Sequence, residues 1–93
     1  MASISITLLT TSQTLDGNTE AILIDATNNL VNVTLPAITA DGDSYVLSRL
    51  DASLNSVGVV ADITNTINNS SSIIMLPGDK FRVIAYGTNY YLF

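Results

Sequence analysis

Val31-Asn32-Val33-Thr34-Leu35-Pro36 alternates apolar and polar side chains and then ends in proline. Successive side chains of a β-strand point to opposite faces of its sheet, so this pattern predicts a strand with one buried face and one solvated face. Pro36 ends the strand because proline has no backbone N–H to give to a ladder. The same alternation occurs earlier, where Ile4, Ile6 and Leu8 are separated by serine and threonine.

Similar short segments, separated by turn residues, continue to the last residue. Asp16-Gly17-Asn18, Pro77-Gly78 and Gly87-Thr88-Asn89 are turn signals. Good helix formers are scarce, with one Glu and one Lys, whereas Val, Ile and Thr are abundant. We therefore predict an all-β domain of about eight or nine short strands, arranged as a sandwich, barrel or β-prism. The predicted strands cover residues 4–8, 21–25, 31–35, 45–50, 57–60, 73–76, 80–86 and 90–93, with a less regular segment at 63–67.

The apolar content is high for a chain of this size. Ninety-three residues make one domain, 1–93, and 47% of them are hydrophobic while only 12% are charged. Soluble chains average about 25% charged residues. No apolar run approaches the roughly 18–20 residues of a membrane-spanning helix. We therefore expect the excess apolar surface to be buried between subunits, with no membrane partner. Residues 1–14 are expected to form a strand or an arm that docks on a partner.

Charge and residue usage exclude several classes of function. The net charge is −5 and the three cations are Arg49, Lys80 and Arg82, so a nucleic-acid partner is not expected. The absence of cysteine excludes disulfides and thiolate metal sites. The absence of histidine excludes a Ser-His-Asp site and removes the best proton-transfer group near neutral pH. We therefore predict that the protein is not an enzyme and uses no cofactor.

The acidic residues fall mostly at predicted turns, where aspartate bonds to local backbone. A hydrolase with two facing carboxylates is therefore disfavoured. One segment, Asp41-Gly42-Asp43-Ser44, allows two interpretations. It is either an ordinary turn, which we favour, or a loop that offers oxygen ligands to calcium. Whether Asp41 and Asp43 bind a cation stays open at this point, because the distal Glu of the EF-hand pattern is missing.

The aromatic residues near the end of the chain also have two interpretations. Tyr86, Tyr90, Tyr91 and Phe93 are candidates for an interface or for contact with a receptor, including a platform that stacks against sugars. Alternatively, the last strand packs Tyr and Phe into a core. We favour the core because alternate residues of one strand must face inward.

Two runs carry a resemblance to a known group of proteins. They are Val33-Thr34-Leu35-Pro36-Ala37 and Gly87-Thr88-Asn89-Tyr90-Tyr91. In order, with the segments between them, they resemble a β-rich module common in bacteriophage fibre, head-fibre and decoration proteins. The resemblance spans roughly residues 15–93. Tyr90 stands where that module usually has Trp, and Tyr86 where it usually has Asp.

The resemblance implies architecture more than chemistry. It implies a homotrimer on the surface of a virion and no catalytic activity. We therefore expect a virion structural protein, either a homotrimeric capsid decoration (cement) protein or a short head fibre, whose β domain is completed by trimerisation. Its expected partners are copies of itself and capsid or other virion proteins. The alternative is a tail-fibre or spike tip module that binds a host receptor or surface glycan.

The first residues bear on localisation. Residues 1–7 have no basic segment and no continuous apolar run, so we expect no secretory signal. The protein is then made in the host cytoplasm and used on the virion.

Overall fold

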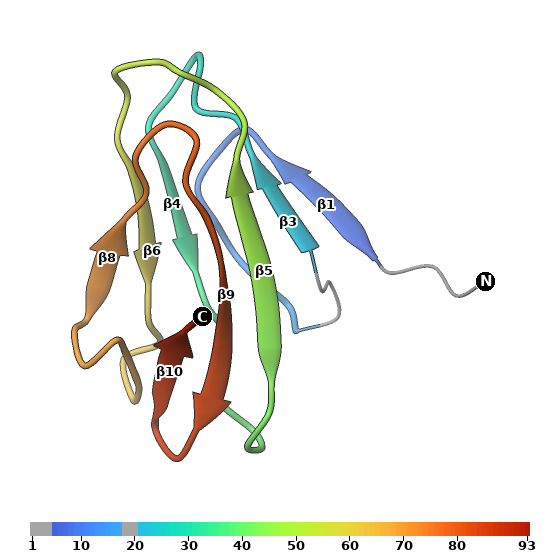
Figure 1. The fold of residues 1–93 in the computed structure, drawn as a ribbon, viewed down its shortest axis with the longest axis vertical. Helices are drawn as coiled ribbons and strands as arrows, with labels where there is room; N and C mark the ends of the chain where they lie inside the picture. The colour runs from blue at the N-terminus through green and yellow to red at the C-terminus, as the bar shows by residue number, and fades with distance from the viewer. Residues whose placement is uncertain (1–4, 18–20) are drawn as a thin grey trace.

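The computed structural model describes residues 5–17 and 21–93, and these residues form two β-sheets and no helix (Figure 1). The predicted all-β class is confirmed. The described residues form ten strands rather than eight or nine, because two of the ten are only two residues long and carry little pattern. Within the described part of the chain, no helix is long and apolar enough to cross a membrane. Ile4, Asn18 and Glu20 lie outside the described residues.

Six strands form the larger sheet, which lies in front in Figure 1. Their order across the sheet is β1 (Ile6–Leu9), β3 (Ala21–Ile24), β5 (Ser44–Arg49), β9 (Lys80–Tyr86), β10 (Asn89–Leu92) and β7 (Thr66–Ile67). The second sheet has four strands, in the order β2 (Gln13–Thr14), β4 (Val31–Thr34), β6 (Val57–Val60) and β8 (Ser72–Ile74).

From β1 to β6 the chain alternates between the two sheets at every strand. As a result β1, β3 and β5 pair in parallel in one sheet, and β2, β4 and β6 pair in parallel in the other. Parallel neighbours need a long crossover, and here a strand of the opposite sheet supplies it. Antiparallel pairing begins only with β8, β9 and β10. The architecture is therefore a β-sandwich in which the chain winds back and forth between the two sheets. The β9–β10 hairpin extends the six-stranded sheet beside β5.

The core lies between the sheets and follows the predicted alternation. In β4, Val31 and Val33 are buried and Asn32 is exposed. The predicted strand at 21–25 is fully buried on one face only. Ile22 and Ile24 reach the core, whereas the other face of β3 is partly open to solvent. The remaining large, fully buried side chains are Leu9, Leu35, Leu47, Val57, Val59, Ile67, Met75 and Tyr90.

Tyr90 joins the two runs that carry the resemblance. Its side chain is 0% exposed, and its hydroxyl donates a hydrogen bond of 2.8 Å to the carbonyl oxygen of Pro36. Its ring packs against Tyr45, with centroids 6.2 Å apart and planes tilted by 58°. Tyr90 brings a strand of one sheet against the end of a strand of the other. The two runs therefore contact each other and close one end of the sandwich.

The turn between β7 and β8 contains two asparagines with left-handed backbone, Asn68 at φ 49° and Asn69 at φ 62°. Ile67 and Ser70 exchange both backbone hydrogen bonds, at 2.7 and 2.9 Å. Two consecutive left-handed residues define a type I′ turn, in which glycine is favoured at the second position and β-branched residues are strained.

The free energy of unfolding of variants at Asn69 is expected to depend on how well the new residue tolerates the left-handed backbone. Asn69→Val lowers the free energy of unfolding by about 1–2 kcal/mol, whereas Asn69→Gly leaves it equal or raises it by up to about 0.5 kcal/mol. Urea unfolding monitored by circular dichroism measures both. Ser71→Val, next to the turn and without a positive φ, is the matched control. Equal losses for Asn69→Val and Ser71→Val contradict the strain argument.

Candidate interaction surfaces

The described residues leave many large apolar side chains in solvent. Eleven of them are exposed on this chain of 93 residues, although the core between the sheets is filled. Single exposed apolar residues are ordinary, but contiguous groups mark surfaces that contact other molecules. Most of these side chains fall into two groups, one on a sheet face and one on a set of loops. The eleven are Ile6, Leu8, Leu30, Leu50, Leu54, Ile63, Ile74, Leu76, Tyr86, Tyr91 and Phe93.

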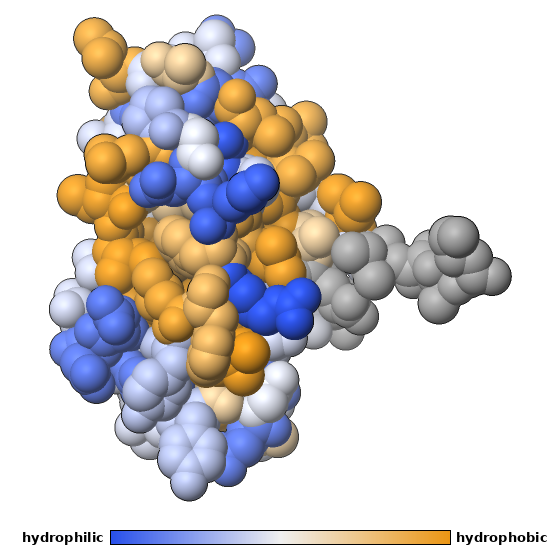
Figure 2. All heavy atoms as spheres, viewed as in Figure 1, coloured by the Kyte–Doolittle hydropathy of each residue, from blue (hydrophilic) through white to orange (hydrophobic). Residues whose placement is uncertain are grey.

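The first group lies on the outer face of the six-stranded sheet, the face turned away from the core. Strand register aligns the side chains of this face in rows across the sheet. One row runs through Ile6, Ala21, Val46, Arg82 and Phe93. A second row runs through Leu8, Leu23, Ser48 and Lys80. Ser44, Ile84 and Tyr91 form a third. Figure 2 views this side and shows orange apolar groups with blue polar groups between them.

The outer face also carries the exposed positive charge of the protein. Lys80 and Arg82 both lie on β9, and both are exposed. Among the described residues, neither makes an ion pair. No strand of the six-stranded sheet contains an acidic residue. This face is therefore apolar and cationic on a protein whose net charge is −5.

The second group lies at one end of the sandwich, the upper end in Figure 1, where the β3–β4, β5–β6 and β8–β9 loops meet. Each loop presents at least one exposed leucine, and Leu54 is fully exposed. Leucine side chains on neighbouring loops bury area only when another surface covers them. We call this surface the leucine end; it consists of Leu30, Leu50, Leu54 and Leu76.

A buried arginine fixes the three loops of the leucine end to one another. Arg49, at the end of β5, is only 5% exposed. Its guanidinium donates to the carbonyl oxygens of Met75 at 2.8 Å and Asn55 at 2.7 Å, which belong to two different loops. It also forms an ion pair with Asp51 at 3.1 Å. Asp51 in turn accepts a hydrogen bond from the backbone N–H of Ala26 in the third loop, at 2.9 Å.

The Asp51 carboxylate is stabilised in its charged form. The hydrogen bonds from Arg49 contribute most, followed by those from Ser53 and the backbone N–H of Ala26, and they hold the pKa of Asp51 well below its ordinary 3.8. The network leaves the leucine end with a fixed shape, since the charges and carbonyls beneath it are satisfied by hydrogen bonds. An interaction surface that is already ordered loses little entropy on binding.

Asp25, Asp43, Asp62 and Asp79 cap their own turns, as the favoured interpretation predicts. Asp43 accepts hydrogen bonds from the backbone N–H and the hydroxyl of Thr39, at 3.0 and 2.9 Å, which lower the pKa of Asp43. Asp41 accepts the backbone N–H of Gly87 at 2.8 Å. Within the described ranges, no three Asp, Glu, His or Cys side chains lie close enough together to hold a metal ion.

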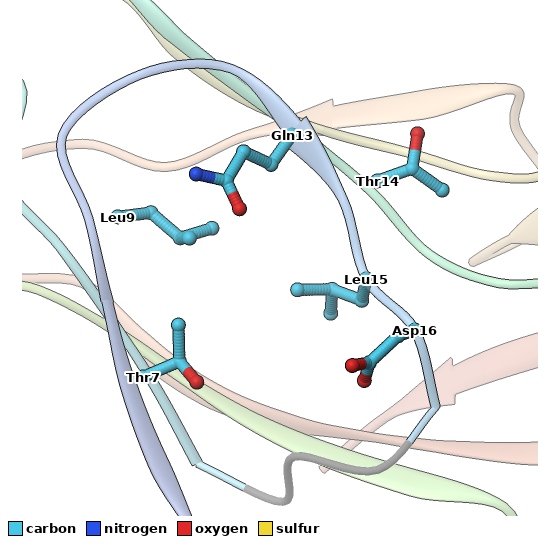
Figure 3. A pocket seen from close by; sticks show the side chains of 6 residues that line it. All are labelled: Thr7, Leu9, Gln13, Thr14, Leu15 and Asp16. Carbon is cyan, nitrogen blue, oxygen red and sulfur yellow. The ribbon is translucent and has the colours of Figure 1, made fainter.

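Two cavities lie in the described part of the surface. A cavity of about 90 Å³ lies at the open edge between β1 and β2, where Leu9 and Leu15 point toward each other (Figure 3). A second, of about 240 Å³, lies beside Pro36, Asp43 and Tyr45. Sites for drug-sized ligands span roughly 300–1,000 Å³. Asp43 is already used by the turn that it caps.

The predicted aromatic contact residues separate into two classes. Tyr86, Tyr91 and Phe93 are 68%, 42% and 74% exposed, and strand register places them on the outer face. Tyr90 follows the favoured interpretation, because its ring lies in the core and no part of it is accessible, and it is therefore removed from the set of candidate contact residues. Successive side chains of β10 point to opposite faces, so Tyr90 turns inward while Tyr91 turns outward.

Sequence reasoning missed the leucine end and its arginine. Its leucines come from three loops that lie far apart in the sequence, and only the winding of the chain brings these loops together. A weak signal exists in the repeated Asp-x-Ser/Thr turns at Asp25, Asp51 and Asp62, each of which follows a strand. Comparison of the chain with protein-family models and with curated proteins finds no match.

Proposed function

We propose that this protein is a structural component of a bacteriophage virion, a homotrimeric capsid decoration protein or short head fibre. The observation that carries the proposal is the pair of apolar surfaces left exposed on a fold whose core is filled. A chain that works alone gains nothing from such surfaces and aggregates through them. A chain that assembles buries them.

The two surfaces suit two different contacts. The outer face of the six-stranded sheet runs along the side of the molecule, so it contacts neighbouring copies. The leucine end closes the sandwich at one tip, so it contacts the particle (Figure 1). Copies that stand side by side with parallel axes point their leucine ends in one direction. Three tips binding together hold the particle far more tightly than one tip alone.

The resemblance supports the same role. The runs at 33–37 and 87–91 resemble those of phage fibre and decoration modules, and they meet through the hydrogen bond from Tyr90 to Pro36. They therefore act as fold determinants. A structural role also agrees with the lack of histidine and cysteine and with aspartates engaged as caps.

Native mass spectrometry of the purified chain tests the assembly. We expect a complex of three times the 9.9 kDa of one chain at micromolar concentration. Particles of the parent phage that lack the protein test the docking. Leu50→Ser/Leu54→Ser is expected to leave the mass unchanged and to weaken binding to these particles at least tenfold. Ile63→Ser, fully exposed at the opposite end, is the control. A wild-type monomer contradicts the trimer, and particle binding that is unaffected by the double change contradicts the docking surface.

A tip module that binds a host glycan is the second candidate, and it rests on the exposed rings of Tyr86 and Tyr91. Aromatic faces stack against sugars, but flat stacking platforms usually stand beside polar groups that fix the sugar. Binding of the wild type to a glycan array, lost in Tyr91→Ala with the trimer intact, favours this candidate. Absence of array binding together with particle binding excludes it.

A further inference from the structure

We infer that the outer face of the six-stranded sheet binds an unlike, acidic surface of the next copy, so that copies join side by side through two different surfaces into a closed ring. The inference rests on the proposed homotrimer and names the surface that builds it. The face is defined by residues on β1, β3, β5, β9 and β10, with Lys80 and Arg82 on β9.

The distribution of charge favours a second copy of the chain as the partner of this face. The Arg49–Asp51 pair is buried and neutral overall, so Lys80 and Arg82 are the remaining cations of the chain. The aspartates that the structure describes, other than Asp51, all lie in loops outside the strands; they are Asp16, Asp25, Asp41, Asp43, Asp62 and Asp79. The two exposed cations therefore lie on the outer face, and the described aspartates lie in loops outside its strands. A second copy supplies the complementary charge without any other partner.

The position of the cations disfavours a symmetric dimer. In a two-fold dimer each surface meets its own equivalent, and the fourth of six strands, β9, lies near the middle of the sheet. Lys80 and Arg82 of one copy then approach the same residues of the other. Like charges brought together in an apolar contact are destabilising, because they lose water and repel. A contact between unlike surfaces avoids this, and such contacts close into rings.

The size of the face also favours a ring. Five strands about 4.8 Å apart, with about 3.3 Å per residue along each, give a flat area of about 400 Å². Stable specific interfaces bury about 800 Å² on each partner. In a ring every copy uses its own outer face and also receives the outer face of a neighbour. Each copy thus buries two such areas, in two separate interfaces, whereas each copy of a face-to-face dimer buries one.

Neutralising Lys80 and Arg82 is expected to change the dissociation constant of a ring and that of a face-to-face dimer in opposite directions. Lys80→Gln/Arg82→Gln is expected to raise the dissociation constant of the assembly at least tenfold, measured by sedimentation velocity of the full chain. A face-to-face contact predicts the opposite, because removal of like charges tightens it. Asn28→Asp/Asn29→Asp makes the same change in net charge in an exposed turn, and it is expected to leave assembly unchanged.

A second pair of variants tests the apolar part of the face. Leu8→Lys lies on the face, whereas Ile63→Lys lies in a loop and is even more exposed, so both are expected to fold. We expect the first to be monomeric and the second to assemble as the wild type does. A wild-type trimer that persists in Leu8→Lys and in the glutamine variant overturns this inference alone. If the wild type is a monomer, the proposed trimer is overturned as well. If the wild type is a dimer whose dissociation constant falls in Lys80→Gln/Arg82→Gln, the contact is symmetric and the ring is overturned.

Discussion

Tyr90→Ala is expected to lower the free energy of unfolding by about 3–5 kcal/mol, the cost of removing a large aromatic side chain from a core. Tyr90 is fully buried, packs against the ring of Tyr45 and donates to the carbonyl oxygen of Pro36. The change leaves a cavity between the sheets and an unsatisfied carbonyl. At roughly 4–8 °C per kcal/mol for a domain of this size, the melting temperature falls by more than about 12 °C.

Two further variants separate the contributions at this position. Tyr90→Phe keeps the ring and removes the hydrogen bond, and it is expected to cost about 1 kcal/mol. Tyr91→Ala changes the next residue, whose side chain faces solvent, and it is expected to cost less than about 1 kcal/mol in the isolated fold. Thermal unfolding at a protein concentration too low for assembly measures all three, because assembly adds to stability and Tyr91 lies on the outer face. Similar losses for Tyr90→Ala and Tyr91→Ala contradict the placement of Tyr90 in the core.

Arg49→Met is expected to lower the free energy of unfolding by about 3–5 kcal/mol, because it removes one partner of a buried ion pair and leaves the other charge uncompensated. The carbonyl oxygens of Met75 and Asn55 also lose their donor. Three loops lose their common anchor, so we expect faster amide exchange at the leucine end than at the opposite end. Hydrogen exchange followed by mass spectrometry measures this difference. Uniform exchange across the molecule contradicts the anchoring role.

Asp51 and Asp62 form a matched pair that isolates the role of the arginine. Each accepts the backbone N–H and the hydroxyl of the residue two positions later, at 3.1 and 2.6 Å in both cases. Only Asp51 also binds Arg49 and the backbone of Ala26. Asp51→Asn is therefore expected to lower the melting temperature much more than Asp62→Asn. Equal effects indicate that the local turn alone accounts for both residues.

The loss of stability caused by Asp51→Asn depends on pH, and the pKa of Asp51 determines the direction of that dependence. The pKa of Asp51 is lower in the folded state than its ordinary value of 3.8. A carboxyl group of this kind contributes its full stability above that ordinary value, and the contribution is lost as the pH falls toward the folded-state pKa. The gap in melting temperature between wild type and Asp51→Asn is therefore expected to be constant between about pH 5 and 8 and to shrink below about pH 4. A gap that widens in acid contradicts the assignment.

The sequence predicts individual strands well because their signals are local. The alternation in 31–35 and the run 80–86 each place a strand within a residue or two of its observed bounds. Strand pairing is not local. Nothing in the alternation of β4 distinguishes an antiparallel partner next along the chain from a parallel partner such as β6, two strands later. Period-two patterns show which side of a strand is buried, but they do not show which strands pair with it.

The candidate surfaces were partly predictable for the same reason. High apolar content predicts exposed or shared surface, and Tyr86, Tyr91 and Phe93 are indeed exposed. Alternation predicts that some aromatic residues near the end of the chain turn into the core, and Tyr90 does so, but the sequence does not identify which of the four turns inward. Leu54 gave no signal, since an isolated leucine in a polar loop is common and only the anchored loops around it give it neighbours.

The alternation of the chain between two sheets has a consequence for how the protein forms. In a meander each strand can pair as soon as its neighbour is made, but here β3 and β5 pair across some twenty intervening residues that must be placed in the opposite sheet. β9 then pairs with β5 in the centre of the six-stranded sheet. Folds dominated by such distant pairings reach the native state in milliseconds to seconds rather than microseconds. During that interval the apolar strands β3 and β5 have an open edge, so the yield of soluble protein should depend on temperature and on the rate of synthesis.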